Sequence, residues 1–296
     1  LYLDKIIGQS SLPKVYIGIG GIVLDNTVFL NTNREMPLLG REYQATGENE
    51  AENAIISAVE SGYRLIDTAS VYKNEENVGG ESPAVEYREN ELFYYYKKYG
   101  IPHSVWETFR VLLKEAGPAQ TGLCGSLSDP LAGSGMLSQH LESTGGNPEP
   151  AALSIGVSNF EIRHLEELEA NSGIIPAVNQ IECHPLCYPK ELIDYCQNKG
   201  IQVQAYAPLA RGAYLDNDVM CVLGTKYAHT PAQIGLRWAT QKGISVIPKS
   251  VHPDRIRSNG NIFDFTIEQE DMDLIDTLNE NFHSSHIPED LRDIAF

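Results

Sequence analysis

An acid, a phenol and an amine lie close together in one part of this sequence, and together they could move a proton. Asp67 and Tyr72 stand five residues apart, and Lys97 ends a later strand-like run rich in tyrosine. A tyrosine with its usual pKa of about 10 is a poor proton donor near neutral pH unless a neighbouring cation lowers that pKa. We therefore hypothesise that Asp67 pairs with Lys97 and keeps it charged, while Lys97 makes Tyr72 a stronger acid. Lys98 is adjacent, and a one-residue slip of the strand would exchange the two lysines.

A second chemical feature is a cluster of positive charge in an acidic chain. Residues 247–259 contain Lys249, Arg255 and Arg257 with a single acid, whereas the whole chain has 40 acidic and 22 basic residues and a net charge of -18. A strand end followed by a short helix offers both charge and backbone N–H groups to a phosphate. TIM barrels often bind phosphate after their last two strands. The pattern predicts an anion site, with a solvated helix face as the alternative.

Composition narrows the class of protein. The negative charge disfavours nucleic acid and anionic membranes as partners, so we expect a small-molecule ligand. Five cysteines without paired CxxC spacing argue against a disulfide framework or a zinc site, and we expect no metal. They fit a reducing cytoplasm. The apolar run at residues 15–24 is far shorter than the ~20 residues that span a membrane, and it lacks the flanks of a signal peptide.

The apolar pattern also predicts the scaffold that positions these residues. From about residue 50, strand-like runs alternate with amphipathic helix-like stretches, which is typical of a parallel sheet made of β/α units. Asp67 would then lie at the carboxyl end of a strand, where alternating barrels place functional residues. Asn159 and Thr230-Pro231 are expected to start helices. We expect strands at 63–67, 91–97, 153–158, 177–182, 201–206 and 244–248, and helices at 49–61, 104–116, 161–171, 189–199 and 230–242.

The remaining stretches are harder to assign. We expect a hairpin or strand within residues 28–43, where Asn31-Thr32-Asn33 supplies turn chemistry. Residues 1–27 match no pattern, so we treat them as an extension of a single domain at 28–296. Residues 117–152 are rich in glycine, serine and proline and contain no apolar run long enough for a central strand, although a barrel needs a strand about there.

Several segments of the chain resemble the aldo-keto reductases, in the order found in that family. Residues 62–79, and the Glu-Leu-Phe run before Lys97, resemble the segments that carry the family's catalytic Asp, Tyr and Lys. The resemblance implies a (β/α)8 TIM barrel and a catalytic tetrad of Asp67, Tyr72, Lys97 and a histidine. His140 is the only histidine in the region of the fourth strand, so it is the candidate for the fourth role. The implied activity is reduction of an aldehyde or ketone to an alcohol by a monomeric enzyme.

The same resemblance implies NADP(H) as the cofactor. One set of residues matches those that hold the adenosine 2′-phosphate in the family, which favours NADP over NAD: Lys249, Ser250, Arg255 and Asn259. A second set matches the residues around the nicotinamide: Ser158, Asn159 and Gln180 at its carboxamide, and Tyr206 stacked on its ring. An amide side chain can both donate and accept, which fixes a carboxamide, and an aromatic platform holds the ring flat for hydride transfer.

The chain departs from the family pattern in two places. Gly40 is followed by Arg41-Glu42 instead of another glycine-containing turn, and residues 118–152 replace both the histidine-bearing fourth strand and the helix after it. We therefore allow for a barrel that is incomplete or distorted around its fourth β/α unit. Three interpretations stay open: a working NADPH-dependent reductase, a catalytically impaired homologue that binds NADP(H) or a partner, and an aberrant translation product without activity.

Overall fold

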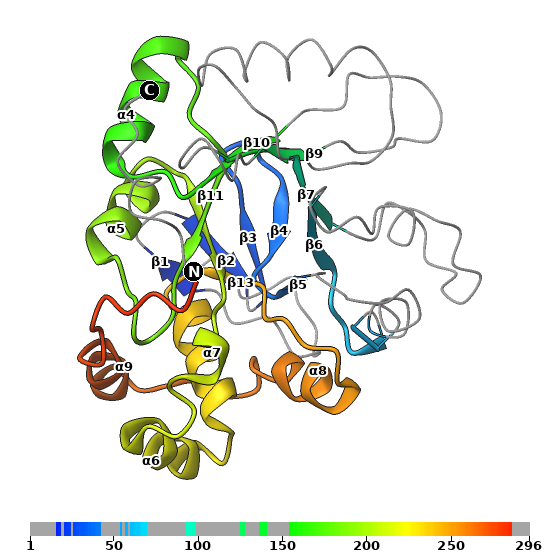
Figure 1. The fold of residues 1–296 in the computed structure, drawn as a ribbon, viewed down its shortest axis with the longest axis vertical. Helices are drawn as coiled ribbons and strands as arrows, with labels where there is room; N and C mark the ends of the chain where they lie inside the picture. Colours follow the sequence, from blue (N-terminus) through cyan, green and yellow to red (C-terminus); the bar gives the residue numbers. More distant parts are fainter. Residues whose placement is uncertain are drawn as a thin grey trace, which may run out of the picture.

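A barrel of strands with helices packed along part of its outside forms the body of the protein (Figure 1). The computed structural model describes residues 16–18, 21–24, 26–42, 54, 57–58, 60–69, 93–98, 125–127, 136–140 and 154–285. Around the barrel the strands follow the order β5 (Gly40–Glu42), β6 (Leu65–Ala69), β7 (Phe93–Lys98), β9 (Met136–His140), β10 (Ser154–Ser158), β11 (Val178–Glu182), β12 (Gln202–Tyr206) and β13 (Ser245–Val246). A short strand β8 (Gly125–Leu127) pairs with β7 beside this path.

The two ends of the sheet meet at a seam between β13 and the start of β5. Leu39 forms a parallel bridge with Val246, and the Val246 N–H donates to the Leu38 carbonyl over 2.8 Å. The Ser245 hydroxyl donates to the Pro37 carbonyl over 3.1 Å. The seam therefore closes the barrel and brings the segment after β13 next to β5.

One strand of the barrel runs against the others. β9 is antiparallel to both β7 and β10, whereas the pairs β5–β6, β6–β7, β10–β11, β11–β12 and β12–β13 are parallel. The expected barrel with a distortion around its fourth unit is confirmed. A strand does occupy that place, which the glycine-rich and serine-rich composition of residues 117–152 had not indicated. Its backbone pairs with neighbours on both sides, and this pairing does not depend on an apolar pattern.

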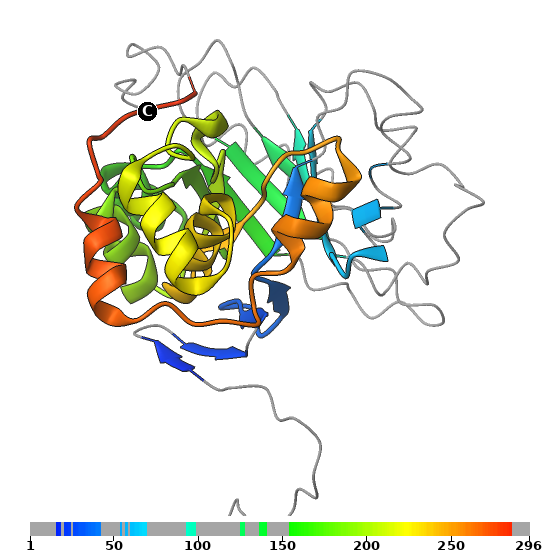
Figure 2. The ribbon, with the colours of Figure 1, turned by 90° about the horizontal axis from the view of Figure 1, so that it is seen from below.

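A small antiparallel sheet covers one end of the barrel (Figure 2). It consists of β1 (Tyr16–Gly18), β2 (Gly21–Leu24), β3 (Thr27–Phe29) and β4 (Glu35–Pro37). The β3–β4 hairpin turns at residues 31–33, as the turn chemistry predicted, and Asn33 there has a positive φ of 59°. A buried cluster joins the hairpin to barrel strands: Val28, Leu30, Met36 and Leu38 with Leu65, Val178 and Ile247. β1 and β2 come from residues 1–27, to which the sequence had assigned no element.

The helices of the carboxyl-terminal half pack on the outside of the barrel. They are α4 (Ile162–Ser172), α5 (Lys190–Asn198), α6 (Asp218–Tyr227), α7 (Pro231–Gln241), α8 (Pro253–Gly260) and α9 (Gln269–Asp276), with a 3-10 turn η3 (Ala210–Gly212). The expected Thr230-Pro231 start is found: Thr230 Oγ1 accepts from the Gln233 N–H, and Pro231 is the first helical residue. The expected start at Asn159 is wrong, because Glu161 is the N-cap of α4. An apolar core fills the space between these helices and the sheet.

Most predicted elements of this half agree with the structure to within two residues, but part of the prediction lies beyond what the structure describes. Residues 54, 57, 58 and 60 are helical, in agreement with a helix at 49–61. The helix expected at 104–116 falls outside the described residues. Within the described part of the chain, no helix is long and apolar enough to cross a membrane.

Candidate active site

The interior of the barrel holds a buried row of polar side chains that ends on Asp67. Asp67 on β6, Gln180 on β11 and Gln204 on β12 each expose 0% of their surface. Gln180 Nε2 donates to Asp67 Oδ1 over 2.9 Å and to Gln204 Oε1 over 2.5 Å. Because side chains alternate along a strand, these residues lie on the inner face, while Val203 packs in the outer core. The structure thus joins the predicted catalytic acid to a predicted nicotinamide ligand.

The two glutamines of this row each have one amide atom with no hydrogen-bond partner among the described residues. Gln180 Oε1 and Gln204 Nε2 are buried and make no hydrogen bond within the described part of the chain. A buried polar atom without a partner costs about 1–3 kcal/mol, so a bound group is the expected remedy. One atom accepts and the other donates, which matches the N–H and C=O groups of a carboxamide. The row therefore fits the polar end of a nicotinamide.

The other predicted nicotinamide residues lie at the carboxyl ends of the neighbouring strands. Ser158 is in register with Gln180, and its hydroxyl donates to the Gln180 carbonyl over 2.7 Å, leaving its oxygen able to accept. The Asn159 N–H donates to the same carbonyl over 2.9 Å, and Asn159 has a φ of 58°, which asparagine tolerates better than most residues. Tyr206 is half-buried at the end of β12, in register with Glu182. The whole set gathers at one edge of the sheet.

Lys97 lies on β7, the strand next to the one that carries Asp67. Asp67 pairs with Tyr95, and Ala69 pairs with Lys97, so Lys97 lies at the carboxyl end of β7. Lys98 is the last residue of this strand. The choice of Lys97 over Lys98 stays a prediction. Tyr72 lies outside the described residues.

His140 lies away from this edge. In the antiparallel pairing, His140 is opposite Ser154, the first residue of β10, while Met136 is opposite Ser158, the last. The direction of β9 thus carries His140 toward the amino end of β10, and the register does not bring it beside Ser158. Its assignment as the fourth catalytic residue gains no support from this position.

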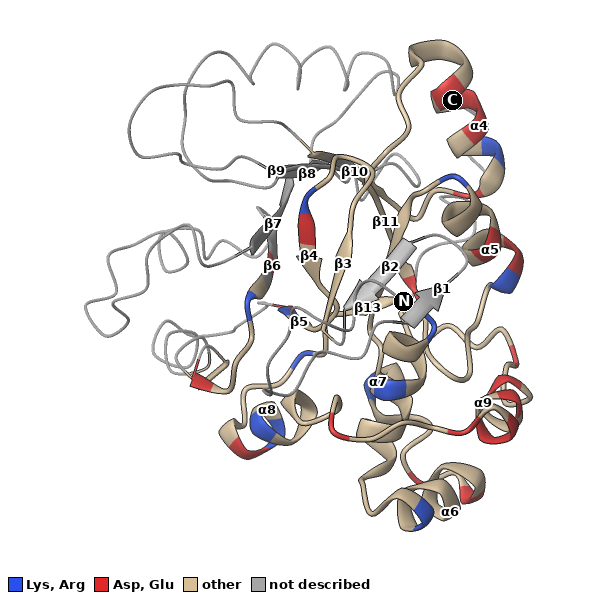
Figure 3. Cartoon of the chain, turned by 180° about the vertical axis from the view of Figure 1, so that it is seen from behind, with Lys and Arg blue, Asp and Glu red and all other residues tan. Residues whose placement is uncertain are grey.

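The predicted phosphate residues lie on α8 and on the turn before it. Lys249 and Arg255 are exposed, Ser250 is half-buried and Asn259 is buried. The Arg257 guanidinium is paired with Asp254, whereas Arg255 has no partner within the described residues. Figure 3 shows this mixture of basic and acidic residues on α8. Arg255 is therefore the cation of this helix that is available to an anion.

Comparison with known proteins agrees with this geometry. The model of the Aldo/keto reductase family matches residues 151–280. Glyoxal reductase of Bacillus subtilis (strain 168) is 37% identical over 270 residues, which cover 90% of this chain and 98% of the relative. The chain belongs to the aldo/keto reductase family. Among solved structures, the aldo-keto reductase MGS-M4 from a Medee basin deep-sea metagenome library has 32% identity and a TM-score of 0.66, over 86% of this chain and 95% of that one.

Another relative is named for a different substrate. The 9,11-endoperoxide prostaglandin H2 reductase of Trypanosoma cruzi (strain CL Brener) is 34% identical, over 86% of this chain and 92% of the relative. This aldo-keto reductase is thus an oxidoreductase of a family that reduces carbonyl groups and generally uses NAD(P)H. Its barrel is the fold of the family.

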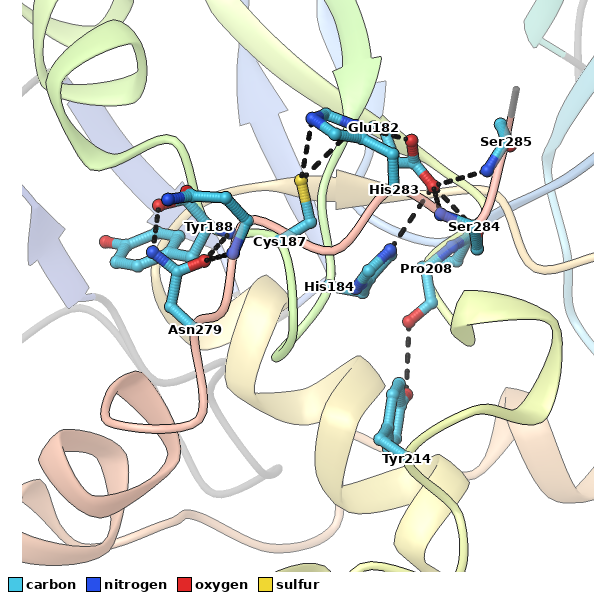
Figure 4. A network of polar contacts seen from close by, with 11 residues as sticks. Glu182, His184, Cys187, Tyr188, Pro208, Tyr214, Asn279, His283, Ser284 and Ser285 are labelled. Carbon is cyan, nitrogen blue, oxygen red and sulfur yellow. Dashed lines mark hydrogen bonds and ion pairs between the residues drawn. The ribbon is translucent and has the colours of Figure 1, made fainter. Parts of the chain in front are cut away.

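A feature of this aldo-keto reductase that the sequence did not reveal is the buried carboxylate of Glu182 (Figure 4). Its Oε1 accepts from the Ser284 N–H over 2.8 Å, the Ser284 hydroxyl over 2.6 Å and the Ser285 N–H over 3.1 Å. His283 Nδ1 lies 2.9 Å from Oε2, and His184 Nε2 lies 3.3 Å from Oε1. Burial alone raises the pKa of Glu182, but the hydrogen bonds from His184, Ser284 and His283 outweigh it and lower the pKa to about 2. The anion therefore holds residues 283–285 at the end of β11.

Cys187 lies beside the Glu182 cluster. Its Sγ is 3.7 Å from His283 Nδ1, the nitrogen that contacts Glu182, and 4.0 Å from Nε2 of the same ring. Within the described part of the chain, no group of three or more His, Cys, Asp or Glu residues is arranged to hold a metal ion. We therefore assign this cluster an anchoring role.

Proposed function

We propose that this chain reduces an aldehyde or ketone to the alcohol with NADPH as hydride donor. The observation that carries the proposal is the buried hydrogen bond between Gln180 and Asp67. It links a residue matched to the nicotinamide site with a residue matched to the proton-transfer site. One continuous site for cofactor and proton donor follows from that link.

The chain's own residues would supply proton transfer and orientation. When bound, NADPH supplies the hydride. Tyr72 gives its proton to the oxygen of the substrate as negative charge develops there, and Lys97 lowers the pKa of that phenol. Asp67 keeps Lys97 charged. Gln180 and Ser158 orient the carboxamide, and Tyr206 supports the ring.

Titration of the purified chain with NADPH, followed by addition of glyoxal, tests the proposal. Glyoxal is the first substrate to try because a relative is named for its reduction. Loss of NADPH absorbance in step with alcohol formation is expected. Binding of NADPH without turnover would instead favour a catalytically impaired homologue. This second candidate is supported by the pairing of His140 with Ser154, which is the first residue of β10 and not the last. Failure to bind NADPH would contradict both, and a chain that does not unfold cooperatively would be an aberrant product.

Preference for the 2′-phosphate can be tested on α8, where two arginines differ in their pairing. Arg255→Ala should raise the Kd of NADPH about tenfold and that of NADH less than twofold, because it removes a cation available to the phosphate. Arg257→Ala is the matched control, since Arg257 is already paired with Asp254. Fluorescence titrations of the unaltered chain and both variants with each nucleotide measure the six dissociation constants. If Arg255→Ala weakened the binding of NADPH and of NADH by the same factor, the 2′-phosphate would not be bound there.

The same proposal includes a small-molecule carbonyl substrate, a monomeric state and a cytoplasmic location. Supporting observations are the net charge of -18 and the four described cysteines, all of which are free thiols. Size-exclusion chromatography with light scattering measures the oligomeric state. A mass well above 32.7 kDa would contradict the monomer.

A further inference from the structure

Arg41 is a buried cation in the place where the sequence departs from its family, and it exposes only 4% of its surface. It lies on β5 and is in register with Ile66. Its Nη2 donates to the Ser250 carbonyl over 2.5 Å. Ser250 belongs to the segment matched to the adenosine 2′-phosphate, so this contact joins β5 to the proposed phosphate site.

The seam of the barrel explains why these two residues meet. Leu39 and Val246 are bridged across the seam, and the chain then runs on to Arg41 on one side and to Ser250 on the other. The Ser250 hydroxyl is itself engaged, since it accepts from the His252 N–H over 3.2 Å at the start of α8. The turn before α8 is therefore fixed by its own side chain and by a donor from β5.

A second anchor holds the same helix from the same side. The Tyr63 hydroxyl donates to the Ile256 carbonyl over 3.0 Å, and Tyr63 is buried. Burial raises the pKa of this phenol, and the positive charge of Arg41 opposes that rise. A Cβ added at Gly260 would lie 3.2 Å from the Tyr63 ring, so α8 packs tightly on this anchor.

We propose that Arg41 is a positioning residue for NADP recognition, an inference that rests on the proposed function. By holding the Ser250 carbonyl, Arg41 sets the backbone from which Lys249 and Ser250 meet the 2′-phosphate. Its loss should therefore weaken binding of NADPH more than binding of NADH, because only NADPH carries that phosphate. Arg41 itself does not touch the nucleotide in this assignment.

Nucleotide titrations of the full chain and three variants test the assignment. Arg41→Met removes the donor and should raise the Kd of NADPH about tenfold with less than a twofold change for NADH. Arg41→Lys keeps a donor and should show about a threefold change for NADPH. Arg237→Met is the control, because Arg237 is equally buried, at 4% exposure, but donates to Thr266. It should leave the ratio of the two constants unchanged.

The outcomes separate this inference from the proposed function. If the unaltered chain fails to bind NADPH, both are overturned. If it binds NADPH but Arg41→Met leaves the ratio of the two dissociation constants unchanged, whether or not both constants rise, the positioning role alone is overturned. Should Arg41→Met not fold, Arg41→Lys decides by the same ratio. An unchanged ratio in that variant would also overturn the role.

Discussion

Two buried charges at the carboxyl ends of barrel strands hold two segments in place, and they differ in sign and in what they hold. Arg41 on β5 donates to one backbone carbonyl of the turn before α8. Glu182 on β11 accepts from two backbone N–H groups and a hydroxyl of residues 283–285, with His283 and His184 close by. The cation holds the segment matched to the cofactor phosphate, and the anion holds the end of the described chain.

The two anchors lie in different parts of the barrel and would act on different properties of the protein. Arg41 and the phosphate segment lie at the seam of β5 and β13, whereas Glu182 lies two residues after Gln180 on β11. The charge of Glu182 is compensated by the groups that it anchors, so removing Glu182 should lower the free energy of unfolding. Removing Arg41 should instead change the preference for NADPH over NADH.

The largest expected effect on stability comes from Glu182→Ala. This change leaves the donors of Ser284 and Ser285 without their acceptor and should lower the free energy of unfolding by roughly 3 kcal/mol, measured by urea denaturation. Hydrogen exchange at the Ser284 and Ser285 amides should accelerate. Asp194→Ala is the control, because its pair with Lys190 is exposed and should contribute below about 1 kcal/mol.

If Glu182→Ala altered the ratio of NADPH to NADH affinity, Glu182 would act on the phosphate site as well, and the two anchors would not have separate roles. A constant ratio together with a lower free energy of unfolding would show that Glu182 acts on stability alone.

A smaller, pH-dependent effect follows from the pKa of Glu182, which falls from about 4.5 to about 2 on folding. A carboxyl group whose pKa is lowered by folding stabilises the protein fully above its unfolded pKa, and this stabilisation is lost as the pH falls from about 4.5 toward 2. The unaltered chain should therefore lose more stability between pH 6 and pH 3 than Glu182→Gln does. Urea midpoints at both pH values provide the measurement. If the unaltered chain and Glu182→Gln lost equal stability between pH 6 and pH 3, Glu182 would not be the responsible group.

Sequence patterns predicted the regular part of this molecule because strands and helices alternate along the chain from β10 onward. Thr230-Pro231 also marks the start of α7 in the chain itself. Gln180 was found by its family motif, but its hydrogen bond to Asp67 joins positions 113 residues apart. Spacing along the chain carries no information on such a contact.

The features that the sequence missed depend on pairing between distant segments. β9 lies in a stretch without an apolar run, and its antiparallel direction follows from its neighbours β7 and β10. Glu182 lies two residues after Gln180, yet its partners lie about 100 residues later in a polar stretch with no motif. Arg41 was recognised only as a departure from the family pattern, because its partner Ser250 is reached across the closed seam.

The variant Tyr72→Phe tests whether Tyr72 is the proton donor in carbonyl reduction. Turnover of NADPH with glyoxal should fall at least about 100-fold, the contribution expected of a positioned general acid, while the Kd of NADPH stays within about twofold. That pattern would separate proton donation from cofactor binding. Turnover equal to that of the unaltered chain would contradict the claim.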